Sequence, residues 1–201
     1  LRREVYDMTK YWMEKGVDGF RLDVINLISK DQRFINDDEN AFTKGKKFYI
    51  NGPRIYEYLK EMNMEVFSKY NSTTVGETMS VTTEIAIDYT KPEKKELNMI
   101  FAMNHLKWDY LNGDKWTYKP IELKELRNIL TNWQYELNKS GAWNSLFWSN
   151  HDQPRAVSRF ADDKSYRVES AKMLATTLHM LKGTPYIYQG EELGMTNPNY
   201  D

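Results

Sequence analysis

The sequence contains no cysteine, which excludes disulfides and thiolate-bound metals and leads us to expect a protein of the reducing cytoplasm. No apolar run is long enough to span a bilayer. The 28 basic and 29 acidic residues are interspersed without long blocks of one sign. That pattern is not typical of a nucleic-acid face or a membrane-binding patch. We therefore predict neither a nucleic-acid partner nor a membrane partner.

The sequence also lacks any cluster of His, Asp and Glu with metal-ligand spacing, and it has no glycine-rich phosphate loop. We predict no metal and no cofactor. What is present is 40% hydrophobic and 14% aromatic residues at a net charge of −1, which is enough apolar material for a sizeable core. Because residue 1 is leucine and already continues a helical pattern, we expect a piece of a longer protein.

A short apolar stretch, 19–25, carries two opposite charges. Its β-branched end and bounding glycines predict a buried strand of a parallel sheet. Arg21 and Asp23 are two residues apart and so project from the same face of that strand. Opposite charges on an apolar wall are costly unless they are paired or used. Two hypotheses remain open here, a structural ion pair and an aspartate kept charged by its arginine to act as a nucleophile.

Two further stretches place polar groups where strands end. A β-branched run over 73–77 ends in Glu77, which by itself is equally compatible with a helix cap or a solvated side chain. An aromatic run over 144–150 ends in Asn150-His151-Asp152, and Pro154 prevents the strand from continuing.

Hydrophobic periodicity organises the rest of the chain. Apolar residues at helical spacing predict helices over 1–15, with Val5, Met8, Trp12 and Met13 on one face, and over 54–69, 122–138 and 166–181. Strands are predicted at 19–25, 73–77, 97–104, 144–150 and 184–188, and polar loops at 29–50 and 107–119. Trp133 and Trp143 are expected in the core. Helices and strands that alternate in this way, with the candidate groups at strand ends, are typical of a (β/α)8 TIM barrel.

The three stretches together resemble the α-amylase superfamily of glycoside hydrolases. The resemblance implies that Asp23 is the nucleophile, Glu77 the general acid/base and Asp152 the stabiliser of the transition state. It also implies that Arg21, His151 and Arg155 contact the substrate. The five strands would be strands four to eight of the α/β barrel, so residues 1–201 would be the C-terminal portion of the catalytic domain. The first three strands, a lid insertion and a C-terminal β domain would lie outside, and the isolated chain is expected to be inactive.

Within the superfamily, the motifs are most similar to two groups, trehalose-6-phosphate hydrolases and oligo-1,6-glucosidases. Val24 resembles the residue found where bonds other than α-1,4 are cleaved. The stretch 105–116 looks like the phosphate-sugar enzymes, and we expect Lys107 and Lys115 there to bind a phosphate. The alternative is that both lysines are merely solvated. The resemblance therefore implies a retaining hydrolase whose expected substrate is the phosphodisaccharide trehalose-6-phosphate. The alternative is an oligo-1,6-glucosidase that acts on a disaccharide or oligosaccharide of the isomaltose type. A transglycosylating isomerase remains open, and a non-catalytic glucosidase-like subunit is disfavoured because all three carboxylates are present.

Overall fold

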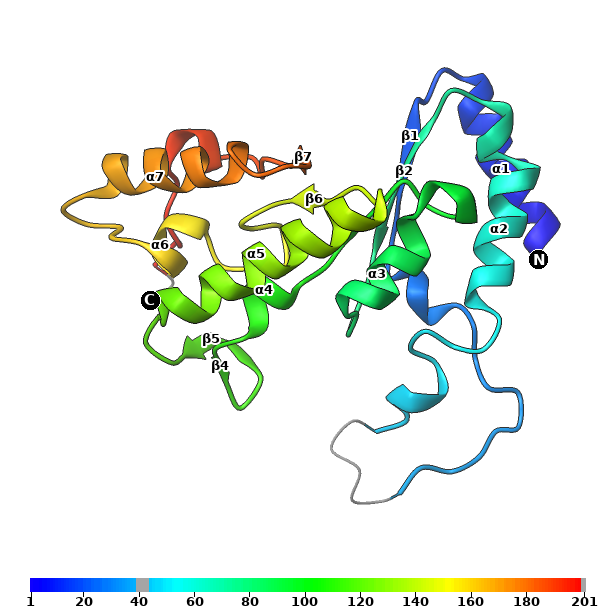
Figure 1. Cartoon of the computed structure of the whole chain (residues 1–201), viewed down its shortest axis with the longest axis horizontal. Helices are drawn as coiled ribbons and strands as arrows, with labels where there is room; N and C mark the ends of the chain where they lie inside the picture. Colours follow the sequence, from blue (N-terminus) through cyan, green and yellow to red (C-terminus); the bar gives the residue numbers. More distant parts are fainter. Residues whose placement is uncertain (39–43, 200–201) are drawn as a thin grey trace. The chain divides into compact units, whose positions relative to one another are not determined.

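The computed structural model describes residues 1–38 and 44–199. These residues form two units. The first is made of Leu1–Met103 with Glu136–Trp143, and the second of Asn104–Tyr135 with Asn144–Asp201. Figure 1 labels the helices and strands of both units along the chain. No helix in the described ranges has the length and apolar character needed to cross a membrane.

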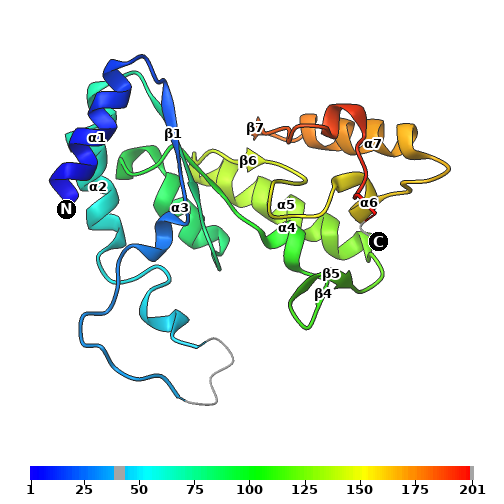
Figure 2. The ribbon, with the colours of Figure 1, turned by 180° about the vertical axis from the view of Figure 1, so that it is seen from behind.

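The first unit is built around a three-stranded parallel sheet in the order β1-β2-β3. The strands are β1 (Gly19–Leu22), β2 (Thr73–Glu77) and β3 (Met99–Phe101). Strands β1 and β2 pair in parallel, as Figure 1 shows, and Figure 2 gives the view of β1 from behind. Because the neighbours are parallel, each connection crosses back through helical segments, as parallel pairing requires. These segments are η1 (Ile25–Leu27), η2 (Lys46–Phe48), α2 (Ile55–Glu65) and η3 (Phe67–Lys69) before β2, then α3 (Thr83–Thr90) and η4 (Pro92–Lys94) before β3.

Helix α1 (Arg2–Glu14) packs beside α2 in the first unit, as both views show. The predicted helix is confirmed, but its predicted apolar face is partly wrong. The residues that enter the core cluster with Val66 and Phe67 are Tyr6 and Met13. Met8 and Trp12 are 49% and 47% exposed. The helix therefore presents the stripe through Tyr6, Thr9 and Met13, because the amphipathic tyrosine can bury its ring as well as an aliphatic side chain can.

The second unit contains a hairpin, several helices and a parallel strand pair. Strands β6 (Ser145–Leu146) and β7 (Thr184–Pro185) pair in parallel. The other elements are α4 (Asn104–Lys107), β4 (Tyr110–Leu111), β5 (Asp114–Tyr118), α6 (Ala156–Phe160), α7 (Arg167–His179) and η5 (Glu191–Leu193). Helix α5 (Leu123–Ser140) contributes residues to both units. The predicted helices 122–138 and 166–181 are thus confirmed as α5 and α7.

The predicted loop at 107–119 is wrong, because the chain forms the antiparallel hairpin β4–β5 there. The turn signal Asn112-Gly113 was present in the sequence. Both residues have positive φ, 52° and 76°, as a tight two-residue hairpin turn requires. The flanking strands are short, so they offer too few positions for the alternation that identifies a strand by pattern alone.

All five predicted strands exist, but four of them are shorter than predicted, and only 73–77 has the predicted length. The strand predicted at 19–25 ends at Leu22, and those predicted at 97–104, 144–150 and 184–188 shrink to two or three residues. Trp143 is 42% exposed and is not a core residue, whereas Trp133 is buried as predicted. Helices α3 and α6 have no counterpart among the predictions. They are short, and the apolar stripe on which helix prediction rests is correspondingly weak.

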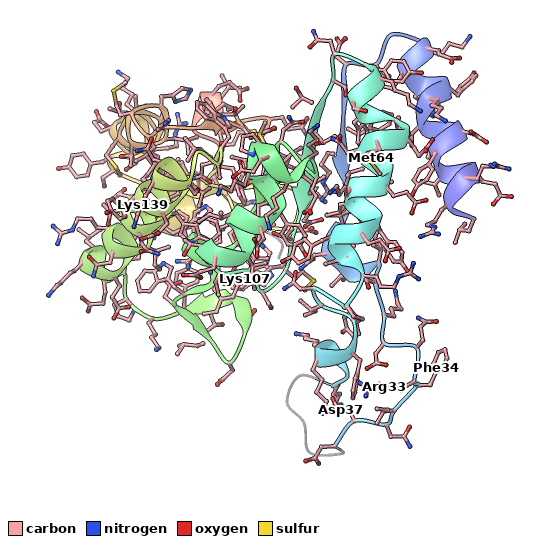
Figure 3. All side chains as sticks on the ribbon, turned by 45° about the vertical axis from the view of Figure 1, so that its right-hand side comes forward. Arg33, Phe34, Asp37, Met64, Lys107 and Lys139 are labelled. Carbon is pink, nitrogen blue, oxygen red and sulfur yellow. The ribbon has the colours of Figure 1, made fainter. Side chains whose placement is uncertain are left out.

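The predicted polar loop 29–50 is only partly described. Residues 39–43 lie outside the described residues, and η2 lies just after them. Figure 3 places Arg33, Phe34 and Asp37 along the strand-free segment that precedes this gap. Asp37 is bonded there to Lys47 and to the backbone of Gly45. Phe34 is 85% exposed, so this segment is not anchored by its largest apolar side chain.

Candidate active site

One guanidinium holds the two candidate carboxylates of the first unit. Arg21 donates from Nη1 to Oδ1 of Asp23, and from Nη2 to Oε2 of Glu77 over 2.5 Å. The carboxylates differ in access. The Asp23 side chain is 70% exposed, whereas that of Glu77 is 11% exposed. The shared arginine provides the positive charge that two neighbouring carboxylates need, and it leaves Asp23 open to approach.

Neighbouring parallel strands bring these groups together. Arg21 lies opposite Val75 in the β1–β2 register, Glu77 is the last residue of β2, and Asp23 follows β1 directly. Gly76, just before Glu77, has no space for a side chain, because an added Cβ would lie 2.7 Å from Leu97 and 2.8 Å from Ile25. Ile25 can therefore pack across β2 next to the acid.

Val24, two residues after the end of β1, has an unusual backbone conformation. Its φ of 35° is left-handed, which is rare for a β-branched residue and costs on the order of 1–3 kcal/mol. This conformation turns the Val24 amide toward Glu77, whose Oε2 lies 3.4 Å from it. The strain is therefore located directly beside both carboxylates, where the chain leaves the strand.

The third candidate carboxylate lies in the second unit, in the segment after β6. Nε2 of His151 lies 3.4 Å from Oδ2 of Asp152, and the two side chains are 61% and 57% exposed. The backbone here is turned by Asn150, whose Oδ1 accepts from Asp152 N over 2.8 Å and whose carbonyl accepts from Gln153 N over 3.1 Å. The turn thus presents His151 and Asp152 to solvent on a hydrogen-bonded backbone.

The hairpin β4–β5 holds this turn from one side. Tyr110 of β4 donates its hydroxyl proton to Oε1 of Gln153. Nζ of Lys115, in β5, donates to the backbone carbonyl of Asp152 over 2.7 Å. Lys107, at the end of α4, is exposed, and Figure 3 labels it. The two predicted phosphate ligands are therefore not equivalent, since only Lys115 is tied to the backbone of a candidate catalytic residue.

A buried ion pair lies at the base of the hairpin. Asp109 and Arg159 are bonded, and their side chains are 0% and 3% exposed. The guanidinium carbon of Arg159 lies 3.8 Å from the centroid of the Tyr118 ring. Within the described residues, Oδ2 of Asp109 and Nη1 of Arg159 have no hydrogen-bond partner. Each charge is thus satisfied mainly by the other, so the hairpin depends on both.

Arg155, predicted to contact the substrate, is bonded to the backbone that follows β7. Its Nη1 donates to the carbonyl of Gln189 over 2.5 Å, and its guanidinium lies 4.8 Å from the centroid of the Tyr188 ring. On the same flank Ser149 bonds Glu191, and burial raises the pKa of that carboxyl. The guanidinium of Arg155 is therefore already bonded within its own unit, and its role in binding substrate stays a prediction.

The structure thus groups the predicted site residues into two sets. Arg21, Asp23, Val24 and Glu77 lie together in the first unit. The second unit holds Lys107, Lys115, His151, Asp152 and Arg155, and contacts join Asp152 to Lys115 and His151. In residues 1–38 and 44–199 no group of three or more acidic or histidine side chains could hold a metal ion.

Comparison with known proteins identifies the family of this chain. The alpha-amylase catalytic domain matches residues 1–201. The chain belongs to the α-amylase family. It is 60% identical over 200 residues to a trehalose-6-phosphate hydrolase of Bacillus subtilis (strain 168), covering 100% of this chain and 35% of that protein. It is 56% identical over 203 residues to an oligo-1,6-glucosidase of Parageobacillus thermoglucosidasius, covering 100% and 36%.

Solved structures of the α-amylase family have the same fold over this region. A crystal structure of Bacillus licheniformis trehalose-6-phosphate hydrolase matches with a TM-score of 0.91 and 62% identity, covering 98% of this chain and 35% of that one. An isomaltulose synthase from Erwinia rhapontici NX5 matches with a TM-score of 0.92 and 36% identity, covering 100% and 36%. The chain spans about a third of the length of the curated relatives it matches. The α-amylase catalytic domain is a TIM barrel, so the predicted fold class is confirmed at that level.

Sequence reasoning missed several residues that shape the site. Tyr110, Gln153, Asp109 and Arg159 act through the hairpin, whose Asn-Gly turn was the one local signal for it. Asn26, three residues after Asp23, is fully buried and bonded across to the loop after β2. No periodicity marks a buried asparagine, because its partners, the Met79 backbone and the Asn51 side chain, are far away in the sequence.

Proposed function

We propose that this chain carries the catalytic carboxylates of a retaining glycoside hydrolase. The observation that supports the proposal is the single guanidinium of Arg21 bonded to both Asp23 and Glu77. One exposed and one buried carboxyl group at neighbouring strand ends suit the two roles of a double displacement, nucleophile and acid/base. Retention requires these carboxyl groups to be about 5–5.5 Å apart in the intact enzyme, whereas roughly 6.5–9.5 Å would indicate inversion.

The roles follow from chemistry and position. Asp23 attacks the anomeric carbon while Glu77 gives its proton to the glycosidic oxygen, so that the leaving sugar departs and a glycosyl-enzyme ester remains. Glu77 then takes a proton from water, which cleaves the ester and restores both groups. Asp152 stabilises the oxocarbenium-like transition states, and His151 binds a sugar hydroxyl. Arg21 holds the charge of Asp23 ready for attack.

We further propose that the five parallel strands are strands four to eight of the barrel. Supporting this placement is the order of the carboxylates, each located at or after the end of a strand. Residues 1–201 are then the C-terminal portion of the catalytic domain, and its other strands belong to a longer protein that acts in the cytoplasm. The substrate pocket is complete only in that protein, so the experiments below use the full-length enzyme.

The substrate we propose is trehalose-6-phosphate, cleaved to glucose and glucose 6-phosphate. Support comes from the 60% identical relative of that name and from the lysines in 105–116. The second candidate is an α-1,6-linked oligosaccharide such as isomaltose, favoured by the 56% identical oligo-1,6-glucosidase. A transglycosylating isomerase is a third reading, supported by the likeness to isomaltulose synthase.

The full-length enzyme is expected to release α-glucose from trehalose-6-phosphate faster than from trehalose or isomaltose. The reason is that double displacement retains the α configuration, and the phosphate adds charge-assisted contacts. Proton NMR at early times distinguishes the anomers, and product analysis with sucrose detects isomerisation. β-Glucose as the first product would contradict the retaining mechanism. Faster cleavage of isomaltose would favour the second substrate, and net conversion of sucrose to its isomers would favour the third reading.

Lys107→Ala and Lys115→Ala are expected to differ in their effects on trehalose-6-phosphate. If Lys107 only binds phosphate, its loss raises KM about ten- to a hundredfold, at about 1.5–3 kcal/mol per charged contact, and leaves kcat unchanged. Lys115 also bonds the Asp152 carbonyl, so its loss should lower kcat as well. Steady-state kinetics on the phosphorylated and unphosphorylated disaccharides measures both effects.

Isomaltose provides the matched control for this pair of variants. A neutral substrate has no phosphate to bind, so Lys107→Ala should leave its KM unchanged, while Lys115→Ala should still lower its kcat. Added salt should weaken binding of the phosphorylated substrate more than that of isomaltose. Wild-type KM values in both variants, together with ready cleavage of isomaltose, would contradict the phosphate assignment.

A further inference from the structure

Asn26 connects the two loops that carry the candidate carboxylates of the first unit. It lies in η1, three residues after Asp23, and its side chain is fully buried. Its partner is the backbone of Met79, two residues after Glu77. Nδ2 of Asn26 donates to the Met79 carbonyl over 2.8 Å, and Oδ1 accepts from the Met79 amide over 3.1 Å. The side-chain amide thus pairs with one residue's backbone through both of its ends.

Two further residues hold this amide in place. Nδ2 of Asn26 also donates to Oδ1 of Asn51 over 2.9 Å, and the Asn51 amide donates to the Asn26 carbonyl over 2.9 Å. The hydroxyl of Tyr89, itself fully buried, donates to the same Oδ1 over 2.7 Å. Asn26 and Tyr89 are both inaccessible to water, so an unmade hydrogen bond on either side chain would be costly, and the geometry of the group is strongly determined.

Beyond the ends of β1 and β2, no β-sheet hydrogen bond between them fixes the distance between the two segments. Strand β1 ends at Leu22 and β2 at Glu77, so the segments that follow have no ladder to fix their separation. Val24 is left-handed at this point, and Ser80 has a φ of 52°. Two turned backbones would separate easily without a cross-link. Asn26 supplies that link, and it joins the two segments shortly after Asp23 and Glu77 in the sequence.

We propose that Asn26 is a positioning residue that sets the placement of Glu77 relative to Asp23 by clamping the Met79 backbone. This inference rests on the proposed function, because it assigns Asn26 to the same reaction. Asn26 touches neither the substrate nor the reacting atoms. Its effect is on proton transfer, since a general acid works only within hydrogen-bond reach of the oxygen it protonates. A shift of about 1 Å can cost on the order of a hundredfold in rate.

Asn26→Ala in the full-length enzyme tests this role through the leaving group. A sugar departs only with protonation, whereas 2,4-dinitrophenolate needs almost none. We expect kcat/KM for the disaccharide to fall on the order of a hundredfold, because general acid catalysis contributes about 10²–10⁴-fold. We expect the loss for 2,4-dinitrophenyl α-glucoside to be at least about tenfold smaller, since the acid is not used there. A purely structural defect would lower kcat/KM equally for both substrates.

Asn98→Ala is the matched control. Asn98 bonds the backbone amide and hydroxyl of Thr74, over 2.8 and 3.0 Å, at the opposite end of β2 from Glu77. Loss of the Asn98 side chain should lower the stability of the fold, and any fall in kcat/KM should be the same for both substrates. If Asn26→Ala does not fold, Tyr89→Phe removes only one hydroxyl behind Asn51 and should show the same selective loss at smaller size.

The outcomes test the positioning role of Asn26 and the proposed function separately. Selective loss for the disaccharide in Asn26→Ala or Tyr89→Phe supports the positioning role. Equal losses for both substrates in whichever of these variants folds, while the wild type is active, overturn it and leave the proposed function standing. A wild-type enzyme that cleaves neither the disaccharides nor the aryl glucoside overturns the proposed function and the positioning role with it.

Discussion

Replacing Asp23 by asparagine is expected to reduce the turnover of the full-length enzyme by on the order of 10⁴–10⁶-fold, the scale seen when a covalent nucleophile is removed. The amide is nearly the same size as the carboxylate but cannot form the glycosyl ester. The side chain of Asp23 is largely exposed, so the fold should not depend on its charge. Steady-state kinetics and circular dichroism of the same preparation separate lost chemistry from lost structure.

Adding azide shows which carboxylate has which role, because the anion can occupy the space of a missing carboxylate. In Asp23→Asn, azide should attack an activated aryl α-glucoside directly and form the β-glucosyl azide. In Glu77→Gln, the nucleophile remains, so azide should attack the glycosyl-enzyme and form the α-glucosyl azide. Asp18→Asn is the matched control, since Asp18 directly precedes β1 at its other end. Wild-type turnover in Asp23→Asn would contradict the assignment of the nucleophile.

Breaking the buried pair of Asp109 and Arg159 is expected to destabilise the protein by about 3–5 kcal/mol in free energy of unfolding, because each single variant leaves one uncompensated buried charge. Asp109→Ala and Arg159→Met each do this, since the two side chains are almost inaccessible to water. The β4–β5 hairpin should loosen with the pair, because Tyr110 and Tyr118 lie beside the Arg159 guanidinium. Chemical denaturation of the full-length protein measures the loss.

The double variant Asp109→Leu with Arg159→Met should recover much of that stability, because a buried ion pair can often be replaced by apolar residues at little cost. Lys69→Ala is the control, since Lys69 forms an exposed pair with Glu65, and such pairs contribute about 0–1 kcal/mol. Single variants as stable as Lys69→Ala would show that the buried pair does not support the hairpin.

Local spacing was sufficient to predict much of the first unit. Arg21 and Asp23 lie on one face of a strand because side chains alternate along extended chain, and Ile55 and Leu59 are buried because they recur at helical spacing. The β-branched run over 73–77 likewise predicted β2, which ends at Glu77. These features depend on short-range geometry, which is encoded within a few residues and can be read without knowing the fold.

Other features depend on partners distant in the sequence. The exposure of Met8 and Trp12 was decided by which stripe of α1 met Val66 and Phe67. The β4–β5 hairpin was decided by the Asp109–Arg159 pair, 50 residues apart, and by the bond from Tyr110 to Gln153, 43 residues apart. The same holds for Lys115, whose partner is a backbone carbonyl that every residue possesses and that no sequence pattern can single out.

By itself, then, the sequence determined the residue types of the candidate site, their order along the chain and the strands that end in them. Only the tertiary structure decided that one guanidinium serves both Asp23 and Glu77, and that Asn26 clamps the loop behind them. The physical reason is that periodicity specifies which way a side chain faces within its own element. Which groups it meets there depends on how distant elements pack, and a hydrogen bond or ion pair forms only when both partners arrive within about 3 Å.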